Sequence, residues 1–100
     1  MTHYRFQAEL WEYGGSTSWY FLTVPFDQSD EIEELTSLTR RGFGSVRVRV
    51  TIGKTSWTTS VFPDSKRKAY ILPVKKPVRK SEGLDVGSVA DVILELVDPV

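Results

Sequence analysis

The sequence predicts a mainly β fold: a closed, pseudo-twofold β-barrel of about six to seven strands with two short helices. Three observations support this prediction. Apolar and polar residues alternate in several short segments, which is the period of a half-buried strand. Links that contain glycine or proline separate these segments. The order strand, proline, helix, strand also occurs twice, in a chain whose 100 residues suffice for one domain, 1–100.

The first half contains two expected strands and a helix. Apolar residues alternate through 4–10, Gly14-Gly15 suits a tight turn, and 19–24 returns as a strand. This second strand is apolar on both faces, which is typical of a central position. A helix is predicted over 27–39 because acidic residues fill its first turns and bases follow its end, as the helix dipole favours. The residues suited to cap it are Asp27 and Ser29.

The second half is richer in strands. The clearest strand is 46–52, where four aliphatic residues alternate with polar ones. Gly53-Lys54 joins it to a returning strand over 56–62, in the manner of a two-residue hairpin link. A short strand over 70–72 and a final alternating strand over 90–96 complete the pattern.

A helix of barely two turns is expected between those last two strands. Pro77 lies near its first position and Gly83 lies just past its end, which is the usual placement of both residues. Segments 21–25 and 70–74 both lead through a proline into a helix and then a strand. We expect each half to supply strands that close the other, so that few sheet edges are exposed.

Composition excludes several classes of protein. The chain has no cysteine, which excludes disulfides, thiolate nucleophiles and Cys-ligated metals. Its single histidine is His3, so we expect neither a catalytic triad nor a zinc site, and no cofactor. No apolar run approaches the roughly 20 residues of a membrane span, and residues 1–5 are not typical of a signal peptide. We therefore expect a cytoplasmic protein that binds no membrane.

Charges are sorted along the chain, although its net charge is zero. Between Arg40 and Lys80, twelve bases accompany one acid, Asp64, whereas the remaining segments contain twelve acids and one base, Arg5. This asymmetry has three interpretations: an anion-binding face, two parts of the fold that attract each other, or a solvated surface.

The basic segment around the second helix is the best candidate for a binding surface. A basic helix and loop neutralise phosphates, and Trp57 or Tyr70 would supply a stacking face. Alternatively, the bases only keep the domain soluble, these two aromatics belong to the core, and one of Trp11 and Trp19 is exposed beside the first hairpin. We predict a non-enzymatic binding or assembly module for an anionic ligand or a protein partner. The predicted ligand-binding residues are Arg41, Trp57, Ser60, Tyr70, Lys75, Lys76, Arg79 and Lys80.

The chain resembles the DUF1905 family of uncharacterised bacterial domains, most distinctively over 57–87. The resemblance implies a double-split β-barrel, in the broad fold group of the swapped-hairpin DNA-binding domains of antitoxins and transition-state regulators. The chain departs from the usual family pattern at Lys54 and Lys68, where glycines are common, and at Ser88, where an aspartate is common. The residues that resemble the family are Arg41-Gly42, 48–53, Trp57, 60–64, 70–74, Lys75, Lys76, Arg79, Gly83, Leu84 and Gly87.

Two further functions are open alternatives. Nucleic-acid binding follows from that fold analogy, although one helix is acidic and the other basic, unlike the symmetric basic face of those dimeric regulators. A lysine-dependent enzyme would use Lys75 or Lys76 as a base or Schiff-base amine. The stretch Gly53-Lys54-Thr55-Ser56 is similar to the end of a phosphate-binding loop, but Val48 replaces the first glycine of that motif. We interpret it as a hairpin turn.

Overall fold

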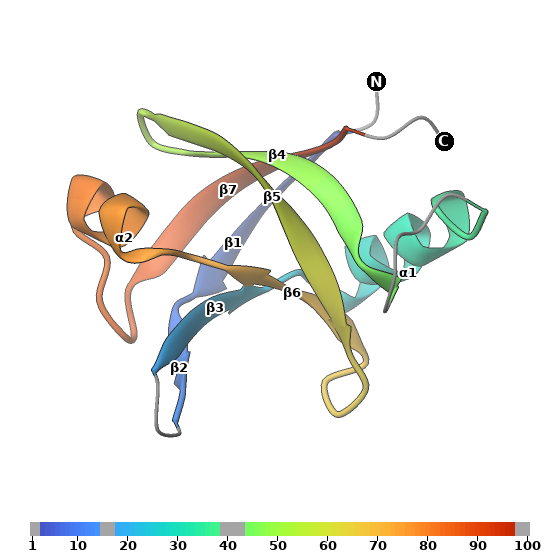
Figure 1. Cartoon of the computed structure of the whole chain (residues 1–100), viewed down its shortest axis with the longest axis horizontal. Helices are drawn as coiled ribbons and strands as arrows, with labels where there is room; N and C mark the ends of the chain where they lie inside the picture. Colours follow the sequence, from blue (N-terminus) through green and yellow to red (C-terminus); the bar gives the residue numbers. More distant parts are fainter. Residues whose placement is uncertain (1–2, 15–17, 39–43, 98–100) are drawn as a thin grey trace.

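The computed structural model describes residues 3–14, 18–38 and 44–97 and shows a mainly β domain. Two helices, α1 (Phe26–Leu35) and α2 (Lys76–Glu82), lie at opposite ends of its longest axis (Figure 1). The strands between them form a curled, antiparallel half-barrel. They are β1 (His3–Glu9), β2 (Trp11–Tyr13), β3 (Trp19–Thr23), β4 (Val46–Ile52), β5 (Thr55–Asp64), β6 (Ala69–Pro73) and β7 (Val89–Leu96).

The sheet has two free edges. Its strand order is β1-β7-β4-β5-β6-β3-β2, so β1 and β2 are the outermost strands and the expected closure of a double-split barrel is not confirmed. These two edges are nevertheless consecutive in the chain and meet at Leu10. The Leu10 N–H donates to the Ser88 carbonyl at 2.8 Å, and the Gly87 N–H donates to the Leu10 carbonyl at 2.9 Å. The continuous segment formed by β1 and β2 therefore pairs with β7 before Leu10 and with β3 after it.

The two halves of the chain occupy equivalent places in the sheet. β3 lies beside β6, and β4 lies beside β7. The Val24 N–H donates to the Tyr70 carbonyl, and the Val74 N–H donates to the Tyr20 carbonyl, both at 2.9 Å. The equivalent residues of these two hydrogen bonds, the two valines and the two tyrosines, are fifty positions apart in the chain. The similarity of 21–25 and 70–74 is thus one of position in the sheet, although Pro25 follows Val24 whereas Pro73 precedes Val74.

The core follows from the alternation that the sequence shows. On β4, Val48 and Val50 are fully buried, whereas Arg47 and Arg49 are exposed. The same alternation holds along β7, which confirms both predicted strands. At the centre of the β3–β6 pair, Leu22 and Leu72 lie directly opposite each other, and neither side chain is exposed.

The helices differ in how well their predicted bounds agree with the structure. α1 ends at Leu35, four residues before the expected end, and Ser29 lies inside it rather than at its cap. The buried Ser29 hydroxyl instead donates to the Val24 carbonyl and accepts from the Tyr70 N–H, both at 3.0 Å, which ties α1 to the sheet. α2 has the expected bounds, and Gly83 ends it with φ of 64°. Neither described helix has the length and apolar composition needed to cross a membrane.

Candidate functional site

Helical spacing brings three of the predicted ligand-binding bases together. Lys76, Arg79 and Lys80 lie at positions i, i+3 and i+4 of α2 and therefore share one side of it. They line an open hollow of about 360 Å³. The other residues of its wall are Tyr20, Gly83, Leu84 and Asp85. Lys75 precedes α2 and is exposed, as is Lys76, so neither amine is in the desolvated environment that a lysine-dependent enzyme requires.

Arg79 is held in place on two sides. Its Nη1 donates to the Val74 carbonyl at 2.6 Å, and its guanidinium carbon lies 3.8 Å from the centre of the Tyr20 ring. Arginine stacks on aromatic faces in this way through cation–π attraction. The arrangement leaves a fixed positive charge at the wall of the hollow.

The other predicted residues do not share a surface with one another. Tyr70 is 2% exposed, so it is a core residue and offers no stacking face. Trp57 is half-buried and packs against the core, whereas Ser60 lies on the opposite face of β5 by strand alternation. Arg41 lies outside the described residues.

A second surface, which the sequence analysis did not identify, lies on the outer face of the sheet. Strand pairing places Trp11 beside Phe21 and Phe21 beside Pro73. It also places Tyr13 beside Trp19. The exposed fractions are 61% for Tyr13 and 53% for Trp19, so large rings remain open to solvent. The residues that line this open groove of about 440 Å³, called the aromatic face below, are Trp11, Tyr13, Trp19, Phe21, Phe62, Ile71 and Pro73, with Asp64 at its margin.

The rings of the aromatic face pack against one another. The ring centres of Trp11 and Phe21 are 5.0 Å apart, and those of Trp19 and Phe21 are 6.3 Å apart and nearly parallel. These separations are within the range of favourable aromatic pairs. The Trp11 Nε1 donates to Thr23 Oγ1 at 2.9 Å, which fixes the indole on the sheet. The aromatic face is thus built on ordered strands rather than on loops.

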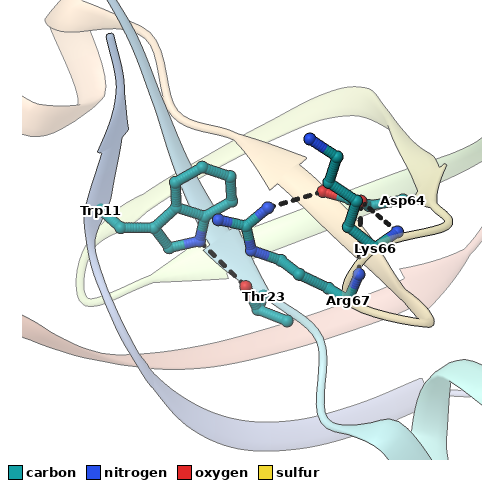
Figure 2. Close-up of polar contacts among 5 residues, drawn as sticks. All are labelled: Trp11, Thr23, Asp64, Lys66 and Arg67. Carbon is teal, nitrogen blue, oxygen red and sulfur yellow. Dashed lines mark hydrogen bonds and ion pairs between the residues drawn. The ribbon is translucent and has the colours of Figure 1, made fainter.

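An arginine from the β5–β6 turn crosses to this face. Figure 2 shows the Arg67 side chain extending from the turn to the indole of Trp11. Its guanidinium carbon lies 3.7 Å from the ring centre, and its Nη1 is 2.8 Å from Asp64 Oδ2. The turn itself is held by Asp64, whose Oδ1 accepts from the backbone N–H of Lys66 at 2.9 Å. Lys68 closes the turn with φ of 53°, a left-handed conformation that fits a position where glycine is common.

The Arg67 contact also lowers the pKa of Asp64. Partial burial acts to raise the pKa of this carboxyl. The hydrogen bonds from the Arg67 side chain and from the backbone N–H groups of Arg67 and Lys66 outweigh burial and hold the pKa of Asp64 below its ordinary value. These hydrogen bonds therefore stabilise the charged form of Asp64 and hold Arg67 beside Trp11.

Exposed bases lie at both ends of the aromatic face. Lys66 and Arg67 lie on the turn at one end. At the other end, the exposed Lys75 follows Val74, whose N–H donates to the carbonyl of Tyr20, the residue after Trp19. Outer residues of β5 lead from Phe62 through Ser60 toward the exposed Arg47 of β4, which pairs with Ser60. Basic side chains thus lie near an apolar, ring-lined surface.

One local signal indicated this surface. Trp11 and Tyr13 have the spacing of residues on one strand face, as do Trp19 and Phe21, and the two pairs flank a hairpin turn. The expectation that one of the two tryptophans is exposed is confirmed by Trp19. The apolar character of both faces of 19–24 indicated a central strand, and β3 does lie between β6 and β2. The outer face of this strand is apolar because its side chains line the solvent-facing groove.

The fold and these surfaces define a small β domain with two candidate binding surfaces. Within residues 3–14, 18–38 and 44–97, no group of three His, Cys, Asp or Glu side chains is placed to hold a metal ion. The chain belongs to the DUF1905 family, a domain of unknown function, whose family model matches residues 6–94. The match includes the aromatic face and α2. No curated protein matches the chain at a significant level.

Proposed function

We propose that this chain is a non-enzymatic binding module whose aromatic face binds single-stranded nucleic acid. The proposal depends on the row of rings from β2, β3 and β5 on one exposed sheet face, with basic side chains at both ends. Unpaired nucleobases stack on such rings, and each stacked nucleobase contributes about 1–3 kcal/mol to the free energy of binding. Tyr13, Trp19 and Phe62 are the rings with the most open surface, at 61%, 53% and 41% exposure.

Charge favours a polyanion over a neutral partner. Arg67 lies over the Trp11 ring, the exposed Lys66 precedes it on the turn, and Asp64 is the single acid of the groove wall. Basic side chains along a ring-lined surface contact the phosphates of a nucleic acid while its nucleobases stack on the rings. A protein partner with an apolar patch would contact the rings alone, and its affinity would not depend on these basic side chains.

A single strand suits this surface better than a duplex. Stacking on protein rings requires bases that are not already stacked in a helix. In addition, α1 has acidic residues along its length and α2 has basic ones, so the domain lacks the symmetric basic face that dimeric duplex binders use. The proposal therefore rests on the exposed rings and not on fold analogy.

The test is fluorescence anisotropy with labelled oligothymidylate and oligouridylate of about ten nucleotides at low salt. We expect binding that weakens with salt, with a log–log slope of about −2 if three phosphates are contacted. Trp19→Ala and Phe62→Ala should each weaken binding by about 10- to 100-fold, as loss of one stacked base predicts. Phe26→Ala is the matched control, because Phe26 is also highly exposed, at 62%, but lies on α1.

Three outcomes would contradict the proposal. One is no detectable binding of either oligonucleotide at low salt. Another is an equal loss of affinity in the Phe26→Ala and Phe62→Ala proteins. The third is self-association in sedimentation velocity that Trp19→Ala abolishes, without oligonucleotide binding, which would assign the aromatic face to a second copy of the chain.

A further inference from the structure

We infer that the hollow beside α2 is a separate binding site for a phosphomonoester dianion. It is independent of the aromatic face, because Tyr20 alternates with Trp19 and Phe21 along β3 and so belongs to the other face of the sheet. The inference depends on three features of the hollow: a fixed guanidinium, a net charge that matches a dianion, and a partly apolar wall.

The first feature is the preorganisation of Arg79. Its backbone carbonyl accepts from the Leu84 N–H at 2.8 Å and from the Gly83 N–H, which ends the helix at this point. Its side chain is fixed by the Val74 carbonyl at 2.6 Å and by the Tyr20 ring. A free arginine side chain loses rotamer entropy when it is ordered. Arg79 is already ordered in the folded protein, so most of this entropy is lost before an anion binds. Hydrogen bonds from its remaining N–H donors therefore contribute more to the binding free energy.

The second feature is charge. The wall has three bases, Lys76, Arg79 and Lys80, and one acid, Asp85. Its formal charge at neutral pH is therefore +2, which matches a phosphomonoester with two negative charges. The two lysines are one helical turn apart and lie on the same side as Arg79, so all three reach one anion. Bases that converge on a phosphate form charge-assisted hydrogen bonds, which are stronger than neutral ones.

The third feature is the rest of the wall. Tyr20 and Leu84 are apolar, partly buried and packed against the core, so they offer a surface to the organic part of a ligand. A hollow of about 360 Å³ is larger than a phosphate group needs. The structure therefore favours a small phosphorylated molecule over inorganic phosphate alone.

The experiment is an ¹H–¹⁵N NMR titration of the folded domain with phenyl phosphate, a monoester, and diphenyl phosphate, a diester. We expect localised shifts of the Tyr20, Gly83 and Leu84 amides with the monoester and much weaker ones with the diester. Affinity for the monoester should rise between pH 5 and pH 7.5, because its second proton leaves with a pKa of about 6. Lys76→Ala/Lys80→Ala should weaken monoester binding at least about tenfold, as loss of charge-assisted bonds predicts.

The control is Arg47→Ala/Arg49→Ala, which removes the same charge from exposed positions on β4. Both lysines are exposed, so their removal should leave the fold intact, as the NMR spectrum itself reports. Equal weakening in both double variants, equal affinity for the two esters, or no localised shift would each overturn the inference. Oligonucleotide binding is measured separately, since Trp19→Ala should weaken it by about 10- to 100-fold without changing phenyl phosphate binding.

Discussion

Alkaline unfolding provides a quantitative test of how α1 packs on the sheet. Tyr4 is an inward-facing β1 residue, 7% exposed. Burial, together with the nearby carboxylate of Glu31 on α1, raises the pKa of Tyr4 to about 12 from its ordinary value near 10. The perturbation is Tyr4→Phe, which removes the ionisable phenol and retains the ring.

The sign and size of the effect follow from proton linkage. Because the folded-state pKa is the higher one, the unfolded chain releases this proton first, and native stability falls as pH rises from 10 through 12. A shift of about two units corresponds to about 2.7 kcal/mol once both states are ionised. At pH 11 only the unfolded phenol is largely ionised, so about half of this, ~1.4 kcal/mol, is lost, and at pH 8 almost none.

The assay is urea unfolding of the wild type and of Tyr4→Phe at pH 8 and pH 11. We expect the wild type to lose about 1.4 kcal/mol more than the variant between the two pH values, since all other groups titrate in both proteins. Tyr13→Phe, which removes an exposed phenol, should behave as the wild type, and Glu31→Gln should recover part of the loss. An identical loss in the wild type and Tyr4→Phe would refute the placement of Tyr4 beneath α1.

Two further predictions concern stability. Leu22→Ala and Leu72→Ala should each cost about 2–5 kcal/mol by chemical denaturation, and the double variant should deviate from the sum by about 0.5–3 kcal/mol because the two side chains face each other. Strict additivity would contradict their contact. Gly53→Ala should cost about 1–2 kcal/mol, because Gly53 has φ of 58° and an added methyl would displace the Glu82 carboxylate, which accepts from Thr55 at 2.6 Å. An unchanged melting temperature would contradict that strain.

Local signals predicted most of the elements. The alternation of 46–52 and 90–96 identified β4 and β7, and Pro77 with Gly83 gave the bounds of α2. Each of these signals comes from residues that are close in the sequence, where intrinsic propensity and helix capping determine the secondary structure. The end of α1 was predicted less well, since its helical pattern extended past Leu35 while the structure does not continue the helix there.

Long-range pairing was the part that local signals did not predict. The alternation through 4–10 indicated one strand, whereas the chain changes partners at Leu10, pairing with β7 before it and with β3 after it. Which strand lies beside which depends on contacts between distant segments, for which no single residue type is diagnostic. The aromatic face was missed for this reason, because it forms only when β2, β3, β6 and the end of β5 are adjacent.

The sorted charges of the sequence acquire a physical explanation from the strand order. β4, β5 and β6 are neighbours in the sheet, so the basic part of the chain remains together in space, between the acid-containing β7 and the β2–β3 hairpin. At one boundary, residues of opposite charge are neighbours across strands, since Arg49 of β4 lies opposite Glu95 of β7 in the register. At the other boundary, the bases around β6 have few acids opposite them and border the aromatic face. Cross-strand attraction between the basic segment and the acid-containing β7 therefore accounts for the charges on the β4–β7 side. It does not explain Lys66 and Lys75, which supports the proposal that this side of the sheet binds an anion.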